Sequence, residues 1–469
     1  MKNLISLIGI CFLFVNALAQ ETSAPAVSSS SSQIYIKMGD AHTKKSLIAL
    51  PPFQFGGNPS ATPNFQALGG DLYRVIQNDL MMSSYFQFIS QTAFLEDVSK
   101  KSIRPFPDDP NGFKFESWKQ IGTEFLVRGN FSISGSDISL EIITYHVPRA
   151  TVILAKKYKG TSGNLRRIGH TFCNDLLEAL TGKKGFFLSK VAAASDRSGN
   201  NYREIYVMDW DGNEIQKITN HKSVALSPAW SHDGTKISYT AFVQRTRTKT
   251  RNADLFIYEY LSGKRWLVSY RQGLNSGSAF APNDQALLLT LSQNGNPDIY
   301  KIDTDGAMIS RLTSGPRNAM NIEPVYSPDG KKIAFSSDRS GQPMIYTMDA
   351  DGGNIKRLTF AGHYNATPAF SPDGKKITFA GWEADHFDVF VMNTDGTEIV
   401  RITSAKKPNG RPAMNEDPVF SPDGRLLMYT SNRSGSNQIY ISNLDGSEEH
   451  RITNDSSNYF KPKWSVNIE

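Results

Sequence analysis

Residues that commonly carry catalysis are few and scattered in this sequence. There are eight histidines in 469 residues, and no two of them stand at the spacing of a metal-binding pair. The nucleophile motif G-x-S-x-G, the zinc motif H-E-x-x-H and the phosphate-binding motif G-x-x-x-x-G-K-[ST] are missing. His363 and His386 are the best placed histidines, because both fall in predicted loops, but solitary surface histidines are common. We therefore expect no enzymatic activity, no metal and no cofactor.

One acidic motif, Asp-x-Asp-Gly, recurs and has the chemistry of a calcium ligand set. It ends the segments IYVMDWDG, IYKIDTDG and IYTMDADG, which begin at Ile205, Ile299 and Ile345. An EF-hand loop also needs a third ligand position and a distal glutamate, and neither follows here. Asp and Gly also favour tight turns, because Asp bonds to its own backbone and Gly accepts positive φ. We interpret the motif as a turn rather than a calcium site.

The two cysteines do not predict a disulfide. Cys11 lies in a predicted leader, so the mature chain keeps only Cys173. Cys173 belongs to RRIGHTFCNDLLEAL, whose apolar spacing indicates a helix. We interpret it as a buried core thiol rather than a nucleophile.

Residues 1–19 have the pattern of a secretory signal peptide. The short basic start MKN precedes the apolar run LISLIGICFLFV, and Ala17-Leu18-Ala19 fits a cleavage site. Residues 20–33 are small and polar, which predicts a flexible serine-rich tether. No later stretch approaches the roughly 20 apolar residues of a spanning helix. The sequence therefore predicts an exported protein that is not an integral membrane protein.

Residues 34–184 predict a small α/β domain. The expected strands are SLIALPPF, YFQFIS, the hairpin FLVRGNFSIS–DISLEIITYHV around Gly135-Ser136, and ATVILAKKYKG. The expected helices are ALGGDLYRVIQNDLMM, the short SWKQIG and LRRIGHTFCNDLLEALTG, which stops at Gly182.

Residues 186–469 repeat one unit six times. SPDGKKIAF begins at Ser327, SPDGKKITF at Ser371 and SPDGRLLMY at Ser421. Segments related to IYxMDxDG, each followed by a basic-apolar-Thr signature, recur at intervals of 42 to 52 residues, with a degenerate copy at 257–269. Four strand-like runs per unit of about 40–50 residues are typical of a β-propeller blade. The sequence therefore predicts an all-β six-bladed β-propeller.

The ends of the repeat region predict how the ring closes. The first unit begins with FFLSKVAAASDRSG, which matches a second strand, so its innermost strand is missing. KPKWS, from Lys461 to Ser465, matches the SPAWS and TPAFS that begin other units. We therefore expect a C-terminal strand to complete the first blade and to remove the exposed sheet edges.

Charge and loop lengths indicate recognition rather than nucleic-acid binding. The formal net charge is +6 over the whole chain, and a hydrophobic share of 39% is enough for packed cores. Both tight turns of each blade should lie on one face, and the longer loops on the other. The basic run at Arg245, Arg247, Lys249 and Arg251 could bind an acidic partner or form a solvated hairpin.

Taken together, the signal, the α/β domain, six blades bearing S-P-D-G-K-K-I-x-F, S-D-R-S-G, I-Y-x-M-D-x-D-G and R-L-T, and the closing KPKWS resemble the TolB family of the Tol–Pal system. The resemblance implies a periplasmic, non-enzymatic adaptor in which the propeller mouth binds the lipoprotein Pal and the N-terminal region binds TolA. Other outer-membrane lipoproteins are further implied partners, and nucleic acid is not. Here a serine-rich tether precedes QIYIKMGD, whereas the family's TolA-binding stretch usually begins near the cleavage site.

The resemblance also implies partner-binding positions next to the innermost strands. They are Leu274, Asn275, Gly277, Asn321, Ile322, Glu323, His363, Asn365, Thr367, Asn415, Glu416 and Asp417. The alternative is that some of them only cap turns. An alternative function is a propeller-based hydrolase or a small-ligand sensor that acts through the central channel.

Overall fold

The computed structural model describes residues 45–199, 202–244 and 251–468, and the described chain forms two compact units that divide after Phe187. The predicted signal peptide and tether lie outside the described residues, as does most of the basic run, of which only Arg251 is described. Among the described helices, none combines the length and the apolar character that crossing a membrane requires.

The first unit is built on one mixed sheet in the order β3-β1-β4-β5-β6, with β2 also paired to β4. The strands β3, β1 and β4 are parallel, and β4, β5 and β6 form an antiparallel meander. The strands are β1 Ser46–Ala49, β2 Gln54–Phe55, β3 Phe86–Phe88, β4 Phe125–Ser134, β5 Asp137–His146 and β6 Thr151–Thr161.

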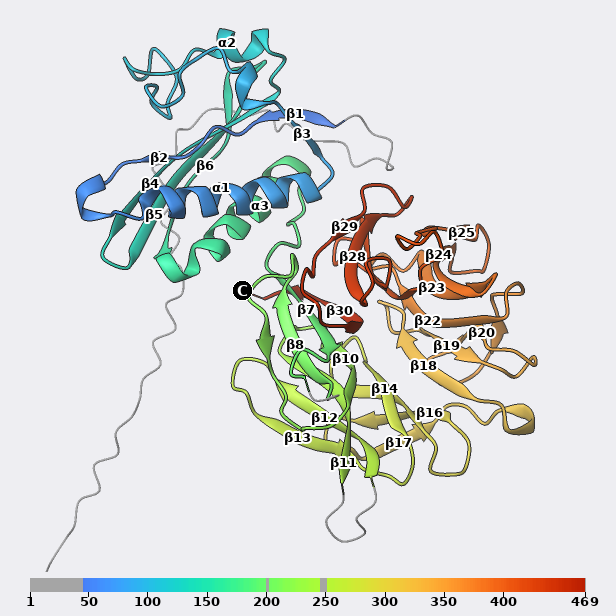
Figure 1. The fold of residues 1–469 in the computed structure, drawn as a ribbon. Helices are drawn as coiled ribbons and strands as arrows, with labels where there is room; N and C mark the ends of the chain where they lie inside the picture. Colours follow the sequence, from blue (N-terminus) through green and yellow to red (C-terminus); the bar gives the residue numbers. More distant parts are fainter. Residues whose placement is uncertain (1–44, 200–201, 245–250, 469) are drawn as a thin grey trace, which may run out of the picture. The chain divides into compact units, whose positions relative to one another are not determined.

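Two long helices lie side by side against this sheet (Figure 1). The helices are α1 Phe65–Met82, the short α2 Phe115–Gln120 and α3 Leu165–Thr181, and 3-10 turns span Pro59–Ala61, Gln91–Ala93, Ser162–Asn164 and, in the second unit, Pro316–Asn318. The helices α1 and α3 approach closely at Gly169, where a Cβ atom would lie 2.8 Å from Val75 Cγ1. Gly182 ends α3 in the left-handed region, with φ of 75°, as the sequence predicts.

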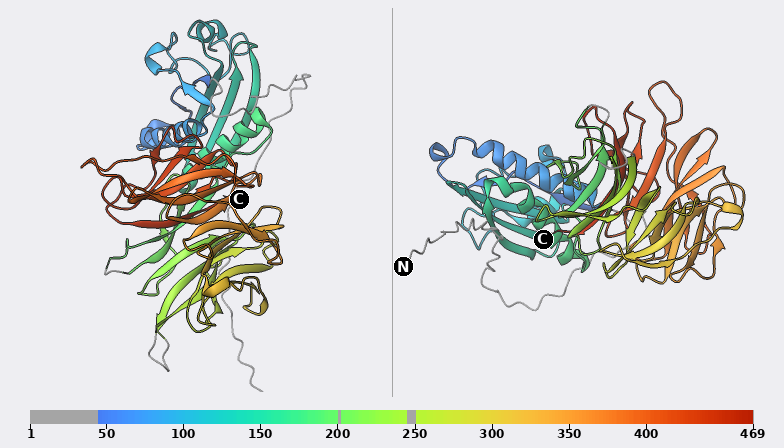
Figure 2. Two further views of the ribbon diagram at one scale, coloured as in Figure 1. Left: turned by 90° about the vertical axis from the view of Figure 1, so that its right-hand side faces the viewer. Right: turned by 90° about the horizontal axis from the view of Figure 1, so that it is seen from below.

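The second unit is a six-bladed β-propeller, as predicted. Each blade is a four-stranded antiparallel sheet, and the blades follow the chain around a ring, from green through yellow to red (Figures 1 and 2). Blade one holds β30 Tyr459–Asn467, β7 Ser189–Ser195, β8 Glu204–Asp209 and β9 Gln216–Lys217. Blade two holds β10 Ala225–Trp230, β11 Lys236–Gln244, β12 Arg251–Glu259 and β13 Arg265–Ser269; blade three holds β14 Asn275–Phe280, β15 Ala286–Leu291, β16 Asp298–Asp303 and β17 Met308–Arg311. Blade four holds β18 Asn321–Tyr326, β19 Lys332–Ser337, β20 Met344–Asp349 and β21 Lys356–Arg357; blade five holds β22 Tyr364–Phe370, β23 Lys376–Glu383, β24 His386–Asn393 and β25 Val400–Arg401. Blade six holds β26 Asn415–Phe420, β27 Leu426–Ser431, β28 Gln438–Asn443 and β29 His450–Arg451.

The repeated motifs make the turns and link the strands of each blade. In blade four, Ser327 Oγ donates to Asp329 Oδ1 at 2.6 Å, and Lys331 N donates to the same oxygen at 3.1 Å, which closes the first turn. Asp-x-Asp-Gly forms the second turn, where Gly352 has φ of 94°. A Cβ atom there would lie 2.6 Å from the carbonyl oxygen of Leu312 in the neighbouring blade, so the motif needs glycine.

The threonine of the basic-apolar-Thr signature joins the outermost strand to the third. Its hydroxyl accepts from the backbone N–H fourteen residues earlier, at 2.9 Å between Thr313 and Ile299. The same bond recurs in blades one, four, five and six. This bond explains why the signature keeps threonine at the end of a very short strand.

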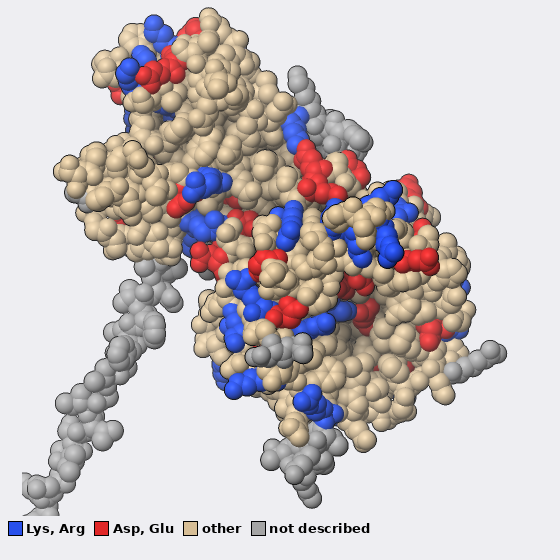
Figure 3. Space-filling view, in the orientation of Figure 1, with Lys and Arg blue, Asp and Glu red and all other residues tan. Residues whose placement is uncertain are grey.

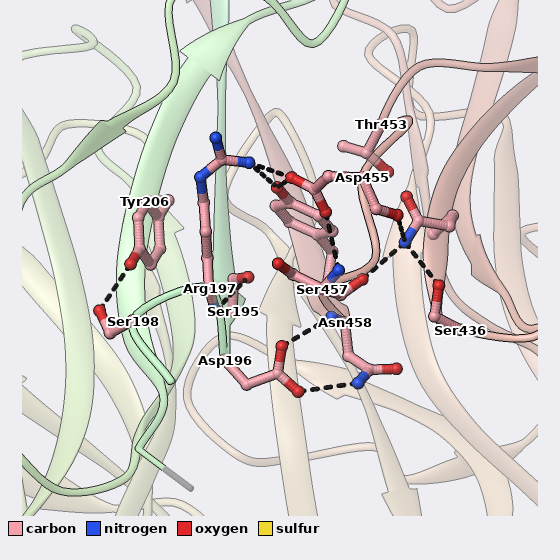
Figure 4. Close-up of polar contacts among 12 residues, drawn as sticks. Ser195, Asp196, Arg197, Ser198, Tyr206, Ser436, Thr453, Asp455, Ser457 and Asn458 are labelled. Atoms are coloured by element: carbon pink, nitrogen blue, oxygen red, sulfur yellow. Dashed lines mark hydrogen bonds and ion pairs between the residues drawn. The ribbon is translucent and has the colours of Figure 1, made fainter. Parts of the chain in front are cut away.

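The C-terminal strand closes the ring, as predicted. β30 pairs with β7, and Trp464 lies opposite Val191 with its Nε1 donating to Ser189 Oγ at 2.6 Å. The loop before β30 adds polar contacts to blade one (Figure 4). Arg197 binds Asp455, and Asp196 accepts two bonds of 2.7 Å from Asn458.

Deleting 459–469 should destabilise the whole propeller, because β7 then becomes an exposed inner edge and Trp464 is lost. Truncating a buried tryptophan to alanine alone costs about 3–5 kcal/mol. Urea unfolding of the purified chain should show this loss, whereas a shorter deletion of 466–469, which keeps Trp464, should have a small effect. Equal unfolding midpoints for the long deletion and the parent would contradict the closure.

Candidate functional site

Every innermost strand carries a bulge at the same point. The pairing of inner and second strands shifts there in all six blades, and the bulged residue has positive φ, between 49° and 62°. A bulge changes the direction in which a side chain points. We call these six residues the bulge ring: Ser227, Gly277, Glu323, Thr367, Asp417 and Lys461.

An ion pair spans the bulge ring. Lys461 belongs to blade one and Glu323 to blade four, which are opposite in a ring of six, and Lys461 Nζ lies 2.5 Å from Glu323 Oε1. Asp417 Oδ1 lies 3.7 Å from the same ammonium. Thr367 N donates to Glu323 Oε2 at 2.9 Å, so the carboxylate is held from two sides. The channel is therefore crossed at this level by a pair of charged side chains.

The pair keeps both of its members charged. Burial alone would lower the pKa of Lys461, but the carboxylates of Glu323 and Asp417 outweigh it and raise this pKa. Burial alone would raise the pKa of Glu323, but the Lys461 ammonium and the Thr367 N–H lower it overall. Removing either partner would leave a half-buried charge without its counter-ion.

A cavity of about 610 Å³ lies on one side of the bulge ring, and we call it the mouth cavity. Its floor includes Glu323, Thr367, Asp417 and Lys461, and its rim includes the exposed His363. The cavity lies at the ends of the inner strands that follow the longer loops, the face on which the sequence places recognition.

One wall of the mouth cavity is aromatic. Phe387 packs edge-on against Trp382 and Tyr364, with ring centroids 4.9 Å and 5.8 Å apart. These residues come from blade five, in which β23 and β24 stay paired as far as Glu383 and His386. The second and third strands of blade five are longer than those of blades three, four and six, and the extra residues at their ends include Trp382 and Phe387 of the aromatic wall.

Glu416 is the one carboxyl among the mouth-cavity residues for which the described part of the chain offers no hydrogen bond or ion pair. Burial, with the neighbouring carboxylate of Asp417, raises its pKa to about 7, although Lys461 acts in the opposite direction. A group with such a pKa is a candidate for a binding function.

The structure brings only part of the predicted site together. Of the twelve predicted residues, Glu323, His363, Thr367, Glu416 and Asp417 line the mouth cavity, and Gly277 belongs to the bulge ring. Leu274 and Ile322 are half-buried and are not among the residues that line the mouth cavity.

The four asparagines are a correction to the predicted site. Asn275, Asn321, Asn365 and Asn415 are at most 3% exposed, so they cannot contact a partner in this conformation. Their amides bond to the preceding blade of the ring. Asn321 Nδ2 donates to Asp298 Oδ1 at 2.9 Å, and Arg339 donates to Asn321 Oδ1 at 2.7 Å. They support the mouth instead of forming its surface.

The two other residues with possible chemistry are also structural. His386 is 8% exposed and lies 2.9 Å from Asp388, beside Arg401. Cys173 is fully buried in α3, and burial raises the pKa of its thiol well above the ordinary value, as expected of a core thiol.

Sequence reasoning missed Lys461 and the aromatic wall. Lys461 was predicted only as part of a closing strand, but aligning KPKW with EPVY and DPVF places it in one column with Glu323 and Asp417. Residues of opposite charge at this shared position of the repeat are the sequence feature that indicates the ion pair. The wall left no such signal, because it depends on the longer hairpin of blade five.

The charge on the molecule gives no continuous basic surface on the face drawn in Figure 3, where Lys and Arg are interspersed with Asp and Glu over the described residues.

Replacing Glu416 with Gln should stabilise the propeller at pH 8 but not at pH 5. A carboxyl whose folded pKa of about 7 exceeds its ordinary value of 4.5 stabilises the fold below pH 4.5 and loses this contribution as the pH rises through 7. The gain of Glu416→Gln over the parent should be larger at pH 8 than at pH 5 by about 2–3 kcal/mol. Urea unfolding at both pH values measures it, with the exposed turn variant Glu398→Gln as control. A constant difference between pH 5 and pH 8 would contradict the raised pKa.

Comparison with known proteins places both units in one family. A model described as the TolB amino-terminal domain matches residues 34–151, and a model described as the TolB beta propeller domain matches residues 177–368 and 364–469. The chain is 32% identical to the Tol-Pal system protein TolB of Desulfosudis oleivorans over 279 aligned residues. The aligned residues make up 60% of each chain. It is 37% identical to the Protein TolB homolog of Chlorobium chlorochromatii over 200 aligned residues, and these residues make up 43% of each chain.

The chain thus spans about 60% or less of the length of these curated relatives. Among solved structures, TolB from Acinetobacter baumannii is similar with a TM-score of 0.73 and 25% identity, over 92% of this chain and 100% of that chain. The amino-terminal model matches most of the first unit, and the propeller model matches most of the second unit. The chain therefore belongs to the TolB family.

Proposed function

We propose that this chain is a non-enzymatic periplasmic adaptor of the Tol–Pal system. It binds the lipoprotein Pal through the propeller mouth and TolA through its N-terminal region, and so supports outer-membrane integrity and constriction at cell division. Membership of the TolB family and the predicted signal peptide support this proposal.

The observation that carries the proposal is the mouth cavity. It combines an aromatic wall at Tyr364, Trp382 and Phe387 with polar and charged residues around it. Interfaces between proteins commonly combine an aromatic anchor with a polar rim. The Lys461–Glu323 pair lies across the floor, which limits how deeply a partner loop can enter.

The same cavity favours binding over catalysis. The described residues that line it include neither a cysteine nor a serine, and the carboxylates of Glu323 and Asp417 are both engaged by Lys461. The TolA-binding role falls before Lys45, outside the described residues, and rests on the family alone.

Replacing His363 and Trp382 together with Ala should weaken the binding of purified Pal at least tenfold, or about 1.4 kcal/mol. Both side chains line the mouth cavity, and the change removes a rim group and one of the three rings of the aromatic wall. Calorimetric titration of the variant with Pal measures the effect, after thermal unfolding has shown that the propeller is intact.

The matched control replaces Asp329 and Asp373 with Ala in the tight turns on the opposite face. This variant should bind Pal as the parent does, with some loss of turn stability. Equal losses of affinity for both variants, or a loss only for the turn variant, would overturn the assignment of Pal to the mouth.

A further inference from the structure

A second cavity, of about 450 Å³, lies on the other side of the bulge ring, and we call it the lower cavity. Glu323, Thr367, Asp417 and Lys461 line both cavities, so the ion pair separates them. The lower cavity reaches the tight turns, where the exposed Pro328 and Pro372 line it. Its volume is within the range of about 300–1,000 Å³ that is usual for small-ligand sites.

The side chains two residues beyond the bulge form the middle of the lower cavity. Five blades place Ala or Val there, and blade one places a lysine. The six residues are Ala229, Ala279, Val325, Ala369, Val419 and Lys463. The next residue in every blade is aromatic, including Trp230 and Trp464, so the surroundings are largely apolar.

Lys463 is the one charged residue at a position that is Ala or Val in the other five blades. The described residues give its ammonium group no hydrogen bond and no ion pair, whereas the neighbouring Lys461 holds both carboxylates of the ring. Burial lowers the pKa of Lys463, and the charge of Lys461 lowers it further, against a smaller attraction to Asp417 and Glu323. Placing an unpaired ammonium among alkyl and aromatic groups is unfavourable. Packing does not require the lysine, since five blades fill the same position with Ala or Val.

We propose that the lower cavity is a binding site for a small amphipathic anion, with Lys463 as the residue that binds its carboxylate. The apolar walls take the alkyl or aromatic body of the ligand, and the ammonium supplies the charge-assisted hydrogen bond that the protein itself does not provide. The site lies on the side of the bulge ring opposite the mouth cavity and reaches the tight turns.

The test uses octanoate as the probe, with 1-octanol and octylammonium as the neutral and cationic analogues of the same chain length. Calorimetric titration of the full chain should show saturable octanoate binding with a Kd below ~1 mM. Lys463→Ala should weaken octanoate binding at least tenfold and leave the weaker binding of 1-octanol unchanged. Lys217→Ala is the matched control, because Lys217 is an exposed lysine in the outermost strand of the same blade.

Lys463→Ala gives blade one the residue that three other blades carry, so the propeller should fold. If it does not, Lys463→Gln keeps most of the side chain and should show the same loss of octanoate affinity. Three results would overturn the proposal: no saturable binding of octanoate, equal octanoate affinity in the parent and the lysine variants, or tighter binding of 1-octanol or octylammonium than of octanoate.

Discussion

The pairing of β30 with β7 is the interaction on which the rest of the propeller depends. It supplies the missing inner strand of blade one, and with it the ring has no open inner edge. The same strand also brings Lys461 and Lys463 into the channel. The strand that closes the ring therefore also supplies the two lysines of its interior. Neither cavity would be complete without this strand.

Repetition and variation have separate roles in this molecule. The turn residues, the signature threonines and the bulges recur in most blades and give a scaffold of nearly constant geometry. Individual positions then differ without changing the backbone. At the bulge, Glu323 and Lys461 attract each other across the ring, while Gly277 offers no side chain. The extended hairpin of blade five adds the aromatic wall on one side only, so a symmetric frame carries an asymmetric site.

The sequence predicts the fold well because each copy of the repeat contains the same strand and turn motifs, and the C-terminal KPKWS matches the motif of an inner strand. It predicts the site less well. The asparagines near the inner strands look exposed in a linear alignment, but Asn321 is buried by Asp298 and Arg339, which are 23 and 18 residues away. Simple alternation along a strand also fails at the bulge, because one extra residue reverses which side chains face the channel. The contact of Lys461 with Glu323 joins residues 138 apart, so only the alignment of the repeats, and no pattern within one repeat, points to it.

The distance along the chain between β7 and β30 also has a consequence for the order of folding. Ser189 and Trp464, which bond to each other, are 275 residues apart. Bringing together the ends of such a loop costs about 5 kcal/mol of chain entropy in a flexible chain, from (3/2)RT ln n. Folding of the five blades between these strands shortens the path between them and so lowers this cost. We therefore expect blade one, the first blade in the sequence, to be completed late in folding, and the two cavities to be complete only when it is.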